Sequence, residues 1–208
     1  MSQINEKHIH ISGSRSFWVF KRIFDIVISI FLMPALFLTY VLLLIFNNFF
    51  NRGPVFFTQY RMGKDCNRFK AIKFRSMISS DYIIRECDDP IEIDRITPLG
   101  NFLRKARLDE LPQIINVFKG EMSLIGPRPD YYEHALMFVE NIPGYRDRHI
   151  IRPGISGLSQ IRLGYAEGIK ATQKKSTIDM FYIKNASFTL DFRIVLATIF
   201  TIFMGRGI

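Results

Sequence analysis

Cysteine, histidine and tryptophan are scarce in this chain of 208 residues, which has two, four and one of them. Cys66 and Cys87 are too far apart for a zinc knuckle and too few for a disulfide framework, so a reducing compartment is the simpler interpretation. His8 and His10 lie near the start of the chain and fit solvated residues better than metal ligands. These shortages argue against a zinc protein and against a disulfide-stapled secreted domain.

Acidic residues are also few, because 19 Asp and Glu oppose 28 Lys and Arg and leave a net charge of +9. The basic residues are scattered, without a basic helix, zinc-finger spacing or aromatic-basic RNA signature, so we expect no nucleic-acid binding. Anionic lipid headgroups and acidic substrates such as nucleotide diphosphates suit this charge better. The length and the 48% hydrophobic content fit one modest domain plus an anchor.

A long apolar segment from Ile23 to Phe46 predicts a membrane anchor. A straight helix of that length would measure about 36 Å, which is enough to cross a bilayer. Pro34 lies near its middle and predicts a kink, which leaves two halves of about 18 Å that reach toward the bilayer midplane without crossing it. Because positive charge flanks both ends, the positive-inside rule selects no orientation. Composition alone favours an ordinary kinked transmembrane helix over a re-entrant hairpin that returns to the same side.

The rest of the chain predicts a mostly helical α+β domain. A small hairpin is expected from strands at 54–59 and 68–75, joined by a turn at 63–65. The acidic segment 81–94 is interpreted as a solvated loop. The organisation expected is a tail over 1–16, a membrane segment over 17–50 and a main domain over 51–208 with amphipathic interfacial helices.

Three helices are predicted after the hairpin. Thr97 and Pro98 open the first, which carries through to Arg107. Apolar residues between 111 and 118 form the second, which Gly120 ends, so that Asp109 becomes the cap and Glu110 falls in the first turn. The third, from 192 to 204, is too short to span a bilayer and either closes the core or lies in the interface.

The acid pair Asp109-Glu110 and the run Gly126-Pro127-Arg128-Pro129 are the residues suited to phosphate chemistry. A carboxylate at a helix N-terminus is stabilised in its ionised form, so Asp109 could attack phosphorus, although plain helix capping explains such a pair as well. Arg128 stands between two prolines on a stiff backbone, from which its planar guanidinium could bind two phosphate oxygens. The alternative is an ordinary tight turn.

Four motifs in order carry a resemblance to a known family. They are Lys73-Phe74-Arg75-Ser76-Met77, Leu108-Asp109-Glu110-Leu111-Pro112-Gln113, Met122-Ser123-Leu124-Ile125-Gly126-Pro127-Arg128-Pro129 and Arg152-Pro153-Gly154-Ile155-Ser156-Gly157. With the apolar anchor, residues 17–204 resemble the bacterial sugar transferases, the monotopic phosphoglycosyl transferases. Departures from the family pattern are Met33 before the kink proline, the Ala106-Arg107 pair and the stretch Gln160–Tyr165.

The resemblance implies transfer of a sugar phosphate from a UDP-sugar to polyprenyl (undecaprenyl) phosphate with Mg²⁺ as cofactor, as the first membrane step of a surface glycan. Asp109 would form a covalent phospho-sugar intermediate, and Glu110 would support the metal or the acid-base step. Further substrate- and phosphate-binding residues implied by the motifs are Lys73, Arg75, Gln113, Arg128, Arg152, Gly154 and Gly157. The anchor would be a re-entrant hairpin kinked at Pro34 in the bacterial inner membrane, with the catalytic domain facing the cytoplasm.

The same resemblance implies membrane lipids as partners, allows a homodimer, and suggests the minimal catalytic form of the family, which acts without an appended regulatory domain. Two rival functions remain from the residues. One is a membrane scaffold of a glycan pathway that keeps the fold without catalysis, and the other is a membrane-tethered phosphatase that transfers the intermediate to water. An intact acid pair and Arg128 favour the transferase over the scaffold.

Overall fold

The computed structural model describes residues 11–78, 92–164 and 168–204. The first ten residues with His8 and His10, most of the acidic segment 81–94 with Cys87, and Tyr165 lie outside these ranges. The regular elements are α1 (Arg15–Phe50), β1 (Phe56–Met62), β2 (Arg68–Phe74), α2 (Pro98–Lys105), α3 (Gln113–Lys119), β3 (Ser123–Ile125), α4 (Tyr132–Asn141), β4 (Gly154–Ser156), α5 (Leu158–Leu163), α6 (Gly168–Lys184) and α7 (Phe188–Phe203).

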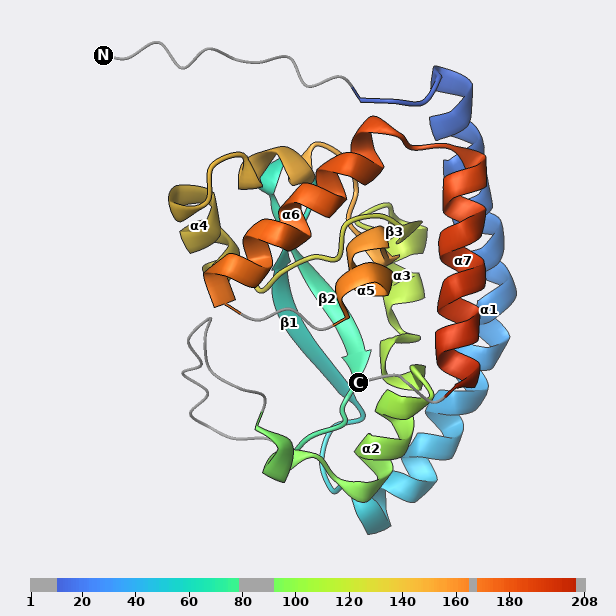
Figure 1. The fold of residues 1–208 in the computed structure, drawn as a ribbon. Helices are drawn as coiled ribbons and strands as arrows, with labels where there is room; N and C mark the ends of the chain where they lie inside the picture. Colours follow the sequence, from blue (N-terminus) through green and yellow to red (C-terminus); the bar gives the residue numbers. More distant parts are fainter. Residues whose placement is uncertain (1–10, 79–91, 165–167, 205–208) are drawn as a thin grey trace.

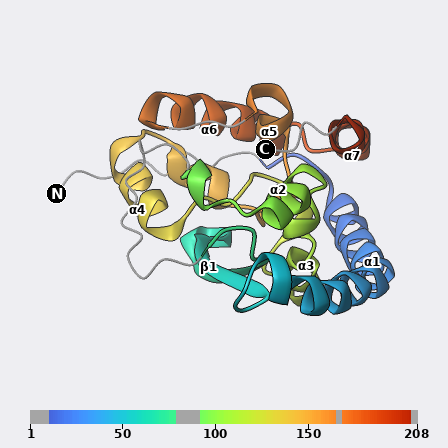
Figure 2. The ribbon, with the colours of Figure 1, turned by 90° about the horizontal axis from the view of Figure 1, so that it is seen from below.

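The α+β class is confirmed, with helices surrounding two small sheets. Strands β1 and β2 form an antiparallel hairpin, and β3 and β4 form a short parallel pair. Figure 1 shows the hairpin in the middle of the molecule, with α3 between it and α1. Seen from below, α5 and α6 lie along the side opposite to the lower part of α1 (Figure 2). The body is therefore assembled around the hairpin and α3.

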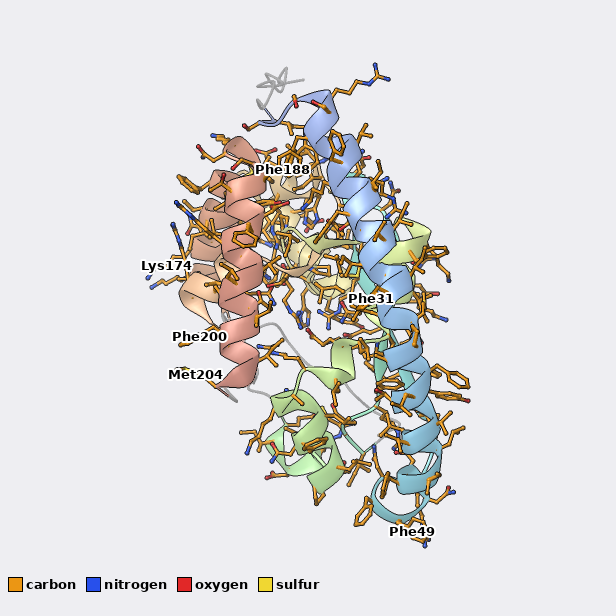
Figure 3. The ribbon with its side chains drawn as sticks, turned by 90° about the vertical axis from the view of Figure 1, so that its right-hand side faces the viewer. Phe31, Phe49, Lys174, Phe188, Phe200 and Met204 are labelled. Carbon is orange, nitrogen blue, oxygen red and sulfur yellow. The ribbon has the colours of Figure 1, made fainter. Side chains whose placement is uncertain are left out.

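Helix α1 is one continuous helix of 36 residues that runs through Pro34. Figures 1 and 3 show that it bows but does not turn back on itself, so the predicted helix-break-helix hairpin is wrong for this structure. The proline removes one helical hydrogen bond, but packing holds the helix on both sides of it. Leu32 and Leu36 share a hydrophobic cluster with Ile114. By length and composition, α1 is the one helix in the described ranges that could cross a membrane.

A polar stripe on α1 is buried against the body, which the sequence did not predict. Lys21, Asp25 and Ser29 recur every fourth residue and are at most 7% exposed. Lys21 Nζ lies 2.5 Å from Asp191 Oδ2 on α7, and the Asp25 carboxylate accepts a hydrogen bond of 3.0 Å from the Leu124 amide on β3. These contacts hold α1 against α7 and against the strand that precedes Gly126.

The soluble elements follow the sequence closely, with shifts of a few residues. The hairpin forms as predicted, although β1 starts at Phe56 and extends to Met62. Helix α2 starts at Pro98 with the Thr97 hydroxyl accepting from the Gly100 amide, as expected. Helix α7 begins at Phe188, four residues earlier than predicted, because Ser187 caps it and its hydroxyl accepts from the Leu190 amide.

One face of the molecule is strongly apolar. Figure 3 shows α1 and α7 side by side, with Phe31, Phe188 and Phe200 among the labelled side chains. Phe31 is 79% exposed, and a groove between the two helices is lined by Phe20, Ile23, Phe24, Val27 and Phe188. So large an exposed apolar surface is typical of a membrane or protein contact and unusual for a free soluble face.

Candidate active site

The acid pair lies in a tight turn before α3. Arg107 adopts a left-handed conformation with φ of 57°, and Leu108–Glu110 form a single 3-10 turn. Pro112 then occupies the N-cap position of α3, and Asp109 makes no capping bond, so the predicted cap at Asp109 is wrong. The helix starts later because Pro112 fits the entry to a helix and the turn before it is already closed. Gly120 ends α3 in a left-handed conformation, as predicted.

Glu110 is the centre of a buried ion-pair cluster. Its carboxylate lies 2.7 Å from Lys73 Nζ and accepts two bonds from the Arg128 guanidinium, which approaches as a fork. Arg107 Nη1 lies farther away, at 3.9 Å. Burial opposes ionisation, but Arg128 and Lys73 outweigh it and hold the pKa of Glu110 well below its usual range. Glu110 is therefore an anion that organises cations.

Asp109 has a different environment beside the same cluster. It is 8% exposed, and its carboxylate accepts no hydrogen bond from the residues that the structure describes. Burial raises its pKa, Lys73 lowers it, and the adjacent Glu110 raises it, with a net shift upward. A desolvated carboxylate without hydrogen-bond partners, close to cations, is suited to nucleophilic attack on an anionic substrate. The two neighbouring acids thus differ in environment and in the direction of their pKa shifts.

A small pocket opens beside this cluster. Its lining residues are Arg61, Ala71, Lys73, Gln113, Arg128 and Pro129. Burial lowers the pKa of Lys73 although Glu110 partly offsets it, whereas Glu110 raises the pKa of Arg128 against the effect of burial. The lining thus contains the basic side chains of Arg61, Lys73 and Arg128 and the buried side-chain amide of Gln113. Such a lining is suited to phosphate oxygens.

Arg61 is a pocket residue that the motifs did not indicate. It lies on β1 two residues from Gln59, which pairs with Ala71 on β2, so alternation places Arg61, Ala71 and Lys73 on one face of the hairpin. Its Nη1 donates to the Pro129 carbonyl at 3.2 Å. The two-residue period of the predicted hairpin, extended to residue 61, would have identified it.

The glycines of the late motif serve a packing role that the sequence did not predict. A Cβ at Gly154 would lie 2.1 Å from the Gly126 nitrogen, and a Cβ at Gly157 would lie 2.4 Å from the Gly126 oxygen. Gly126 donates its amide to the Ser156 carbonyl, and Gly154 donates to the Pro127 carbonyl, both at 2.9 Å. The close approach that these glycines permit is, among the described residues, to another backbone segment, the one that leads into Arg128, and their contact with a phosphate stays a prediction.

Two predicted binding residues lie away from the cluster. Arg75 donates to the carbonyls of Pro54 and Asn51 and so joins the end of α1 to the hairpin. Arg152 donates to the Gly120 carbonyl at 2.7 Å, at the C-terminal end of α3. The acid pair precedes the other end of this helix, about 10 Å away by its length. The structure brings together Asp109, Glu110, Lys73, Gln113 and Arg128.

A second buried charge cluster lies behind Arg128, and no motif pointed to it. It contains Asp130, Tyr145, Arg148, Lys175 and Asp179. The Arg148 guanidinium is fully buried and donates to the main-chain carbonyl of Arg128 at 2.7 Å. Its members come from three separate parts of the chain, so their meeting depends on the tertiary fold.

The donor set bears on the expected magnesium ion. Within the described ranges, no three His, Cys, Asp or Glu side chains gather as a metal cage. Mg²⁺ is commonly bound by one or two carboxylates together with substrate phosphates, so Asp109, which accepts no hydrogen bond there, fits such a site. Glu110 does not fit, because its oxygens already accept from Lys73 and Arg128.

Comparison with known proteins gives consistent matches. Residues 16–205 match the family model described as bacterial sugar transferase. The chain is 47% identical to a UDP-N-acetylgalactosamine-undecaprenyl-phosphate N-acetylgalactosaminephosphotransferase of Aeromonas hydrophila, over 74% of this chain and 37% of that protein. It is 37% identical to a UDP-glucose:undecaprenyl-phosphate glucose-1-phosphate transferase of Klebsiella pneumoniae, over 91% of this chain and 41% of that protein.

A relative of similar length is the exopolysaccharide production protein PSS of Rhizobium leguminosarum bv. phaseoli, with 37% identity over 91% of this chain and 98% of that protein. The chain thus spans about two-fifths of the Aeromonas and Klebsiella proteins and almost all of the Rhizobium protein. The family match extends from the start of α1 through α7, and includes the acid pair, the pocket and the buried cluster behind it. The chain belongs to the bacterial sugar transferase family.

Proposed function

We propose that this protein transfers a sugar 1-phosphate from a UDP-sugar to undecaprenyl phosphate and releases UMP. The observation that carries this proposal is Asp109, a buried carboxylate that accepts no hydrogen bond from the described residues and feels the charges of Lys73 and Arg128, two residues that line the pocket. The names of the Aeromonas and Klebsiella relatives state reactions of this class.

The reaction would proceed in two displacements at the sugar-bearing phosphorus. A carboxylate oxygen of Asp109 forms a bond to this phosphorus, the bond to the bridging oxygen breaks, and UMP leaves with that oxygen. An oxygen of the lipid phosphate then attacks the same phosphorus, and the Asp109 carboxylate is released as the lipid-linked sugar diphosphate forms. Dividing the transfer in this way replaces one difficult step by two easier ones.

The cations would bind and orient the donor. Arg128 and Lys73 point toward Glu110, which keeps them charged and fixed at the edge of the pocket. Their donors suit the diphosphate oxygens, where negative charge increases on the leaving UMP. Glu110 would thus act by holding these cations. A magnesium ion bound by Asp109 and substrate phosphates would neutralise further charge on the diphosphate.

The apolar face fits a substrate that is anchored in a membrane. Helix α1 is long enough to cross a bilayer, and the groove between α1 and α7 has an apolar lining. The proposed location is the inner membrane of a bacterium with the pocket facing the cytoplasm, where nucleotide sugars are made. The product would be the first lipid-linked intermediate of a surface glycan.

The decisive experiment measures UMP release from a panel of UDP-sugars in nanodiscs, with and without undecaprenyl phosphate and with Mg²⁺ or EDTA. The variants are Asp109→Asn and the matched control Asp65→Asn, an exposed position with φ of 55° that asparagine tolerates. We expect lipid-dependent release from one donor by the native protein and the control, and none by Asp109→Asn.

Other results identify the rival functions. Release of free sugar phosphate without lipid would indicate a phosphatase, and no release from any donor would favour a scaffold. The covalent step is tested separately by intact mass spectrometry after mixing with the active donor alone. A mass increase of one sugar phosphate, absent in Asp109→Asn and present in Asp65→Asn, is expected; its absence in the native protein would contradict the two-step route.

A further inference from the structure

A second arginine, Arg148, donates a hydrogen bond to the main-chain carbonyl of Arg128. Arg148 lies in the 3-10 turn Tyr145–His149, and its side chain is 0% exposed. Its Nη2 donates to the Arg128 carbonyl at 2.7 Å. Because the Arg128 side chain extends to Glu110, the same residue is held by its carbonyl on one side and by its guanidinium on the other.

The Arg148 guanidinium is itself fixed by two carboxylates. Its Nε and Nη2 lie 2.9 and 2.7 Å from one Asp179 oxygen on α6, and its Nη1 lies 2.5 Å from Asp130 Oδ2. Tyr145 donates its hydroxyl to the same Asp130 oxygen at 2.6 Å, and Lys175 pairs with the other. Burying or half-burying four charged side chains, those of Asp130, Arg148, Lys175 and Asp179, is costly unless each is paired, so a gain in stability alone does not account for the cluster.

The cluster is next to the pocket but takes no part in its lining. Asp130 follows Pro129 directly, and Pro129 lines the pocket with Arg128. Burial lowers the pKa of Arg148, but Asp179, Tyr145 and Asp130 outweigh it and keep that pKa above its usual range. Arg148 therefore stays charged, and its planar fork can serve several acceptors at once where a lysine would offer a single point charge.

We propose that Arg148 is a positioning residue of the transferase, which sets the main chain of Arg128 and through it the place of the phosphate-binding guanidinium. The proposal rests on the proposed function, in which Arg128 binds the donor diphosphate. The substrate of the transferase would be a nucleoside diphosphate sugar. Arg148 does not contact this substrate and affects its binding only through Arg128. Replacing the Arg148 guanidinium should therefore shift the position of Arg128 and leave the Arg128 side chain in the protein.

The test is a double-mutant cycle with two readouts, kcat/KM for UMP release and the equilibrium affinity for UDP by calorimetry. Arg148→Lys is measured in the native background and in an Arg128→Ala background. Arg146→Lys, an exposed arginine in the same turn, is the matched control. A misplacement of about 1 Å can cost about 100-fold in rate, so we expect Arg148→Lys to lower kcat/KM by about 10- to 100-fold and to weaken UDP binding.

In the Arg128→Ala background, Arg148→Lys should lower kcat/KM and UDP affinity by less than about 3-fold, because the Arg128 guanidinium that Arg148 positions is absent. A purely structural role would give equal losses in both backgrounds, and that result would overturn the proposal. So would a folded Arg148→Lys protein with native values. If Arg148→Lys fails to fold, Tyr145→Phe removes one hydroxyl beside Arg148 and should show a smaller loss with the same dependence on Arg128.

UMP release and UDP affinity of the native protein distinguish a failure of the proposed function from a failure of the positioning role. If the native protein releases no UMP from any donor but UDP affinity shows the coupling between Arg148 and Arg128, the transferase function is wrong and the positioning role stands. If the native protein neither releases UMP nor binds UDP, both are wrong.

Discussion

Replacing Gly154 with alanine tests whether the contact between β3 and β4 positions Arg128. The new Cβ would lie 2.1, 2.6 and 2.7 Å from the nitrogen, oxygen and Cα of Gly126. Nonbonded carbon contacts are favourable at about 3.5–4.0 Å, so one of the two strands must move by about 1 Å. All three contacts are main-chain atoms, so a side-chain rotation cannot relieve them.

The expected effects on stability and activity have different sizes. Overpacking of this kind costs about 1–3 kcal/mol of the free energy of unfolding. Gly126 is two residues from Arg128, and a displacement of about 1 Å at a phosphate-binding group lowers kcat/KM by about 100-fold. We therefore expect a folded protein with a modest loss of stability and a large loss of activity.

The assay combines UMP release with thermal unfolding in the same detergent. The control is Gly120→Ala, in which an alanine must adopt a left-handed backbone conformation at a cost of about 1–2 kcal/mol in the free energy of unfolding. Its φ is +89°, and its Cβ would lie 3.3 Å from Arg22 Nη2, at the flexible end of a side chain. Gly120 ends α3, at the end away from the acid pair. We expect similar stability in the two variants, with kcat/KM within about 3-fold of native for the control.

A folded Gly154→Ala protein with native kcat/KM would show that this contact does not position Arg128. A parallel loss of activity in the two variants would show the same, because activity would then follow stability alone.

Glu110→Gln leaves a lysine and an arginine without their anion, so we expect a loss of about 3–5 kcal/mol in urea unfolding, which the exposed control Glu140→Gln does not show. His149 is buried neutral with its pKa lowered to about 3 by burial and by Arg148, so the unfolded state binds the extra proton. Stability should therefore be complete above about pH 6.5 and decline below it by up to about 1.4 kcal/mol per pH unit, and His149→Gln should flatten that decline. Lys21 is buried and Asp191 is partly buried, so Lys21→Met leaves the Asp191 carboxylate without its cation and should cost up to about 3–5 kcal/mol, whereas Lys21→Met with Asp191→Leu should recover most of it in thermal unfolding.

Local patterns determined much of this protein. The apolar run from residue 23 is long enough to dictate a helix, and Thr97-Pro98 starts α2 because the cap and the proline act within one turn. The alternating residues of the hairpin pair as expected. Asp109 and Arg128 were identifiable as candidate phosphate-handling residues from their types and their neighbours along the chain.

Only the tertiary structure decided how those residues are used. Glu110 meets Arg128 across 18 positions and Arg148 meets Asp179 across 31, so no short motif records either pair. Helix α1 continues through Pro34 because side chains from other elements pack on both sides of it, and a Cβ at Gly154 would meet the main chain of Gly126. Propensity and capping act over a few residues and can be read along the chain. Packing and buried charge pairing depend on which distant residues become neighbours, and that is settled only when the chain has folded.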